Sequence, residues 1–63
     1  MRDYVKLTNH NGNVVYVNTA MILTIEAGHS NGSSLKMAMS DRVFNIKESP
    51  DEIMKLIKNI LKY

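Results

Sequence analysis

The tetrapeptide Ser49-Pro50-Asp51-Glu52 opens the one segment of this chain whose apolar residues repeat with the period of a helix. A serine cap, a proline at the first helical position and a glutamate three residues after the cap form a capping box. The apolar stripe predicts a helix of about thirteen residues. Its members are Ile53, Leu56, Ile57, Ile60 and Leu61. The rest of the core must therefore come from strands.

Before the helix, apolar and polar residues alternate with a period of two, which is typical of strands. Asn-Gly between two such segments predicts a hairpin. We expect five strands, at residues 3–9, 13–18, 22–27, 34–39 and 42–47. A tight turn at 18–21, a polar loop at 28–33 and a two-residue turn at 40–41 connect the later strands.

The length of the first hairpin loop decides which apolar side chains share a face. A two-residue loop of Asn11-Gly12 would place Leu7 opposite Tyr16. A three-residue loop, with Gly12 in the left-handed conformation, places Leu7 opposite Val15 and Val5 opposite Val17. A slip of one residue moves a whole apolar set to the wrong face. We therefore expect the three-residue loop.

The fourth and fifth strands are paired by the same reasoning. A two-residue turn opposes Met37 to Phe44 and Leu35 to Ile46, so that the apolar faces agree. The third strand, 22–27, has apolar residues on both faces, which favours a central strand covered on both sides.

These elements predict a single α+β domain over residues 1–63, with the order β-β-β-β-β-α. We expect one small antiparallel sheet of about five strands, with the C-terminal helix packed on one face. The covered face is expected to hold eight apolar side chains: Val5, Leu7, Val15, Val17, Leu35, Met37, Phe44 and Ile46.

Sixty-three residues without cysteine limit the possible functions. Disulfides and thiolate metal sites are excluded, and a chain this short buries only ~60% of its unfolded surface. It has little room for the walls of a catalytic cleft, so we expect no enzyme and no cofactor. No apolar run approaches the ~20 residues of a membrane span, and the N-terminal residues do not form a signal peptide, so we expect a cytoplasmic protein.

His10 and His29 are the only histidines, and both lie in expected loops. Their spacing is not that of metal ligands, so no metal site is expected. If the two loops met, the pair would change charge at about pH 6–7. The loop 28–33 is rich in glycine, serine and asparagine; it either forms an anion-binding nest or merely connects two strands.

The sheet face opposite the helix is half apolar, which is typical of a binding surface. Its tyrosines can stack on bases and its lysines can meet an anionic group. The candidate ligand-binding residues are Tyr4, Lys6, Tyr16, Lys36, Asn45 and Lys47. Self-association through this face is the alternative, with an anionic ligand held between the copies. The net charge of +2 is spread along the chain, which argues against binding of duplex DNA.

Several stretches resemble the FlbD-like family of small bacterial flagellar proteins, which includes a swarming-motility member. The matching stretches are Lys6-Leu7-Thr8, Asn11-Gly12, Val15-Tyr16-Val17-Asn18, Ile25-Glu26 and the segment 46–53. Similar short proteins also occur among phage and mobile-element genes. The resemblance implies a cytoplasmic, non-catalytic accessory protein and brings no catalytic or ligand residues with it. The chain departs from the family in its polar loop at 28–33 and at 37–41, where the family tends to have a glycine-containing turn.

Two functions follow as expectations. The first is a non-catalytic binding module that works as a homo-oligomer and sequesters an anionic small molecule, such as a nucleotide signal, or blocks a host protein. A phage would encode such a module as an anti-defence protein. The alternative is an accessory cytoplasmic protein of flagellar function, as the FlbD-like resemblance implies.

Overall fold

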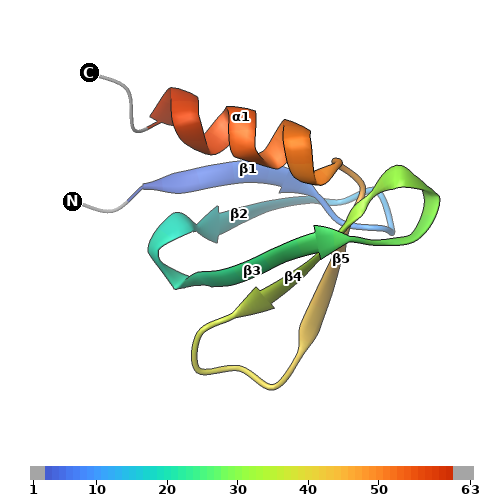
Figure 1. Ribbon diagram of the computed structural model, residues 1–63, viewed down its shortest axis with the longest axis horizontal. Helices are drawn as coiled ribbons and strands as arrows, with labels where there is room; N and C mark the ends of the chain where they lie inside the picture. Colours follow the sequence, from blue (N-terminus) through green and yellow to red (C-terminus); the bar gives the residue numbers. More distant parts are fainter. Residues whose placement is uncertain (1–2, 61–63) are drawn as a thin grey trace.

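The computed structural model describes residues 3–60. Within them the chain forms five strands, two short 3-10 helices and one α-helix (Figure 1). The elements are β1 (Tyr4–Thr8), β2 (Val14–Asn18), η1 (Thr19–Met21), β3 (Ile22–Ala27), η2 (His29–Asn31), β4 (Ser33–Met37), β5 (Val43–Ile46) and α1 (Pro50–Ile60). The α+β class is confirmed, and β3 has the predicted bounds.

The strands form two antiparallel sheets, so the prediction of one five-stranded sheet is wrong. One sheet has the order β1-β2 and the other has the order β3-β4-β5. The sheets join at a corner, where Asn9 forms a bridge with Ile46 and the Lys47 N–H donates to the Thr8 carbonyl at 2.8 Å. The first hairpin loop begins directly after Asn9, so β1 has no further residues to place beside β5. The twist of the strands then carries the two sheets apart.

The first hairpin has the predicted register. Leu7 pairs with Val15 and Val5 pairs with Val17. Gly12 has a φ of +91°, a left-handed conformation that glycine adopts without steric cost. The three-residue loop is therefore confirmed.

The register of β4 and β5 differs from the prediction by two residues. Leu35 pairs with Phe44, where Ile46 was expected. The connection is longer than a two-residue turn, and Met39 within it has a φ of +63° and is 97% exposed. A shift of two residues leaves each side chain on its predicted face, because side chains alternate with a period of two.

Strand β3 is an edge strand, so the prediction of a central strand covered on both sides is wrong. Its pairing with β4 is irregular between Ile22 and Thr24, and Leu23 is 63% exposed. A bulge changes the alternation of side chains, so that Ile22 and Ile25 are both half-buried although a regular alternation would place them on opposite faces.

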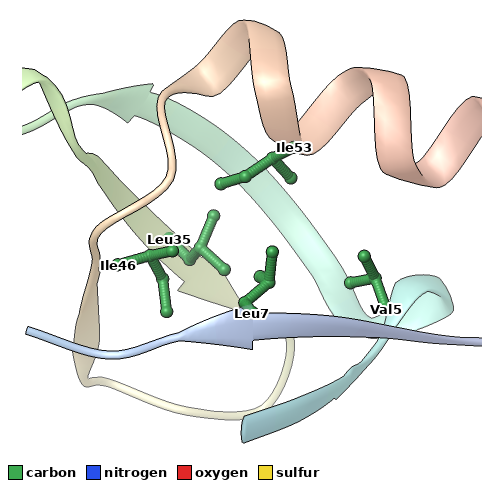
Figure 2. Close-up of a cluster of buried hydrophobic side chains, with 5 residues drawn as sticks. All are labelled: Val5, Leu7, Leu35, Ile46 and Ile53. Atoms are coloured by element: carbon green, nitrogen blue, oxygen red, sulfur yellow. The ribbon is translucent and has the colours of Figure 1, made fainter. Parts of the chain in front are cut away.

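The core consists of five buried side chains between α1 and the strands, namely Val5, Leu7, Leu35, Ile46 and Ile53 (Figure 2). Ile53 extends from the helix toward Leu7 on β1 and Leu35 on β4 (Figure 2). The two sheets and the helix therefore share one core.

Helix α1 begins at the predicted cap, since the Glu52 N–H donates to the Ser49 Oγ at 3.2 Å. Leu61 of the predicted stripe lies outside the described residues. The helix packs mainly against β1 and β3. Phe44 was expected beneath it but is 42% exposed, because the second sheet turns away from the first at the corner. Within residues 3–60 no helix combines the length and the apolar character needed to cross a membrane.

Candidate functional site

A groove of about 470 Å³ opens between β2 and the strands β4 and β5. Its apolar walls include Val15 and Val17 on β2, and Leu35, Met37 and Phe44 on the second sheet. We call it the aromatic groove. It exists because the two sheets meet at one corner and then diverge, while α1 packs mainly on β1 and β3.

Three aromatic rings stand at this groove with much of their surface in solvent. Tyr4 is 48% exposed, Tyr16 is 67% exposed and Phe44 is 42% exposed. Val43, also in the lining, is 52% exposed. Exposed apolar side chains that gather around a hollow are typical of a ligand or partner site.

The polar part of the groove consists of three asparagines and one histidine. Asn9, His10, Asn18 and Asn45 contribute to the lining, and no Lys, Arg, Asp or Glu does so among the described residues. The Asn9 Oδ1 accepts two backbone N–H groups of its own loop at 3.0 Å each, and the Asn18 Oδ1 accepts the Ala20 N–H at 3.0 Å. These two amides hold the loops in place. Asn45 offers an exposed amide to an occupant.

A second cavity of about 390 Å³ adjoins the aromatic groove. His10, Asn45 and Ile46 line both hollows, and His29 and Lys47 line the second. We call it the two-histidine cavity. The two histidine loops therefore meet, since a residue of each lines the same cavity. Figure 1 shows the β1–β2 loop, the segment between β3 and β4 and the end of β5 at the same end of the molecule.

Gly32 and Ser33 hold the His29 loop against the end of β5. A side chain at Gly32 would overlap the Ile46 carbonyl oxygen, so the loop packs directly on the strand backbone. Ser33 is buried, and its Oγ donates to the Glu48 carbonyl at 2.7 Å. The sequence prediction placed Ser33 at the end of the polar loop 28–33, because nothing local indicates this long-range bond.

The carboxylate of Glu48, which follows Lys47 in the sequence, is bonded to Thr8 and is not part of the lining of the two-histidine cavity. The Glu48 carboxylate accepts the Thr8 N–H at 2.9 Å and the Thr8 Oγ1 hydroxyl at 3.0 Å. No carboxylate lines the cavity among the described residues, so its charged and titratable groups are two imidazoles and one ammonium. Within residues 3–60 no three His, Asp or Glu side chains are grouped to hold a metal ion.

The structure brings half of the predicted site residues together. Tyr4, Tyr16 and Asn45 all line the aromatic groove. Lys47, two residues after Asn45, lines the two-histidine cavity.

The remaining two lysines are placed elsewhere. Lys36 lines a small hollow of about 90 Å³ with Glu26 and Thr24. Lys6 is exposed on β1 opposite Tyr16. Neither lysine is among the residues that line the aromatic groove or the two-histidine cavity.

Sequence reasoning missed Phe44, His10 and His29 as site residues. Phe44 alternates correctly with the core residues, and only the divergence of the sheets leaves it open. The two histidines meet through contacts between distant segments, which the spacing along the chain does not reveal.

Comparisons of the chain with protein-family models, with curated proteins and with solved structures find no match.

Proposed function

We propose that the chain is a small non-catalytic binding module that works as a homo-oligomer and takes up an anionic small molecule with a planar ring, such as a nucleotide. The observation that carries this proposal is the aromatic groove, with Tyr4, Tyr16 and Phe44 around an uncharged hollow. A planar ring that stacks on aromatic side chains gains about 1–3 kcal/mol per base.

The dimensions and the chemistry of the groove suit such a ring. Its volume of about 470 Å³ falls within the ~300–1,000 Å³ of ligand pockets. The floor is apolar, and the Asn45 amide supplies a donor and an acceptor for the edge of a heterocycle. The adjoining cavity supplies positive charge through Lys47. A ligand with a ring at one end and an anionic group at the other would use both hollows.

Calorimetric titration with adenosine monophosphate and with ribose 5-phosphate tests this proposal. The two compounds share the sugar and the phosphate, and only the first has a ring. We expect saturable binding of the nucleotide and at least tenfold weaker binding of the sugar phosphate, which corresponds to about 1.4 kcal/mol of stacking. Equal binding of both, or binding of neither, would contradict the proposal.

A partner protein is the second candidate occupant of the groove. The observation that favours it is the lack of Lys, Arg, Asp and Glu in the described lining, which suits an apolar side chain from a host protein or from a protein of flagellar function. Deletion of the gene would then abolish motility, or would abolish the inhibition of the host protein. The wild-type chain would restore it and Tyr16→Asp would not, although the variant protein folds.

The homo-oligomer is proposed to form on a different surface from the groove. Leu23 is 63% exposed and Met54 is 53% exposed, and with Ile57 they line a hollow of about 400 Å³ that shares no residue with the groove. Strand β3 is the edge strand of its sheet at this place, and edge strands readily pair with a second chain. A core of five buried apolar residues is small, and a second copy would enlarge it.

A further inference from the structure

Three chain segments that are distant in sequence each contribute a histidine or a lysine to the lining of the two-histidine cavity. His10 comes from the β1–β2 loop, His29 from η2, and Lys47 from the residue after β5. Ser30, also from η2, adds a hydroxyl to the lining. Imidazole, ammonium and hydroxyl groups all donate hydrogen bonds to an anion when the imidazoles are protonated.

The supporting contacts keep these segments together without a ligand. Gly32 packs on the backbone of Ile46 and Lys47. The His10 N–H donates to the Asn45 carbonyl at 3.2 Å. The carboxylate that follows Lys47 in the sequence, that of Glu48, accepts hydrogen bonds from Thr8. The positive groups of the cavity therefore have no acidic partner among its described lining residues.

We propose that the two-histidine cavity binds a phosphoryl group, and that His10, Asn45 and Ile46, which line both hollows, connect this group to a ring in the aromatic groove. The connection to a ring rests on the proposed function, whereas the anion site rests on the cavity alone. A phosphoryl group carries two negative charges in a small volume and accepts several hydrogen bonds. Lysine holds it as a point charge, and protonated histidine holds it through directed N–H groups.

Binding in this cavity depends on pH. Histidine side chains gain positive charge as the pH falls from about 8 to about 5. The charged and titratable groups that face the cavity are His10, His29 and Lys47, with Glu48 turned to Thr8.

Sulfate is the probe of choice, because its charge does not change over this range while that of phosphate does. Titration into ¹⁵N-labelled protein is followed by NMR. We expect saturable shifts at the amides of residues 10, 29 and 47. We also expect sulfate to bind about tenfold more tightly at about pH 5.5 than at about pH 8, because protonated imidazoles donate charge-assisted hydrogen bonds to it. Neutral adenosine, titrated at the same two pH values, controls for a pH effect on the fold.

The variants His29→Gln and Lys47→Gln are each expected to weaken sulfate binding about tenfold. Lys36→Gln is the matched control, since Lys36 is a lysine of the same sheet that lines a different hollow. Both altered residues are exposed, and the NMR spectrum of each variant verifies its fold. If one variant fails to fold, the other decides the result. Equal sulfate affinity in the variants and the control, or no dependence on pH, overturns the proposal.

A nucleotide and a free phosphate are distinguished by comparing adenosine monophosphate, adenosine and sulfate. Tighter binding of the nucleotide than of both fragments identifies a joined site. Binding of sulfate with no gain from the ring leaves a free-anion site and contradicts the proposed function. Binding of adenosine without any binding of sulfate supports ring binding in the aromatic groove and refutes the anion site.

Discussion

Gly32 and Ser33 show how single residues place the loop that carries His29. Gly32 is buried where a side chain would overlap the Ile46 carbonyl oxygen of β5, and the Ser33 hydroxyl donates to the Glu48 carbonyl. These two contacts hold His29 beside His10 and Lys47. At the groove, by contrast, the important residues are those left uncovered, namely Tyr16 and Phe44.

At this scale Tyr16→Ala is expected to weaken the binding of adenosine monophosphate by about tenfold or more, because stacking on one aromatic ring contributes about 1–3 kcal/mol. Tyr16 is 67% exposed, so the variant is expected to keep its melting temperature. Met54→Ala is the matched control, since it truncates an exposed apolar side chain outside the groove. Calorimetry measures the affinity. An unchanged affinity of Tyr16→Ala for adenosine monophosphate would show that the adenine ring does not stack on Tyr16 in the groove.

The elements differ in how far they depend on distant parts of the chain. The helix start rests on one local hydrogen bond between the Glu52 N–H and the Ser49 Oγ. The helix is held in place by Ile53, which is fully buried against both sheets. Its other apolar residues, Leu56, Ile57 and Ile60, are half-buried around this anchor.

Ser49→Ala is expected to destabilise the protein by about 0.5–2 kcal/mol, because the helix loses its side-chain cap. In a domain of this size about 1 kcal/mol lowers the melting temperature by about 4–8 °C. Ser40→Ala serves as the control, since its Oγ accepts the Arg42 N–H in an exposed loop instead of capping a helix. Thermal unfolding followed by circular dichroism gives both values, and equal melting temperatures for the two variants would disprove the capping role.

Local elements were predictable from sequence, whereas the contacts between them were not. The first hairpin and the helix start follow from turn and cap residues a few positions apart, and both are confirmed at Gly12 and Ser49. The bulge at Leu23 and the longer loop around Met39 depend on how strands fit neighbouring strands. The three candidate residues Tyr4, Tyr16 and Asn45 do line one groove, but the groove itself arises from the divergence of two sheets.

At the scale of the whole molecule, two sheets share one corner and one helix covers one side of the angle between them. This arrangement leaves the aromatic groove open on one surface and the Leu23–Met54 surface exposed on another. The first is proposed to take a ligand and the second to take another copy of the chain.

A dimer is therefore expected in sedimentation equilibrium at micromolar concentration. The double variant Leu23→Lys/Met54→Lys is expected to be monomeric, because charges would then face one another across the apolar contact. Tyr16→Lys, a matched lysine substitution in the groove, is expected to remain dimeric. A wild-type chain that sediments as a monomer of about 7.2 kDa would contradict the homo-oligomer. If Tyr16→Lys dissociates the dimer and the double variant does not, the contact between the two copies lies in the groove.

The most direct measurement of the central claim is a map of NMR shifts during titration with adenosine monophosphate. The shifts are predicted to fall together on the aromatic groove, at Tyr16, Phe44 and Asn45, and on the adjoining cavity, at His29 and Lys47, with one common affinity. Leu23 and Met54 are predicted to be unaffected. Shifts that spare the groove and the cavity, or that spread over the surface without saturating, would contradict the proposal that these two hollows form one binding site.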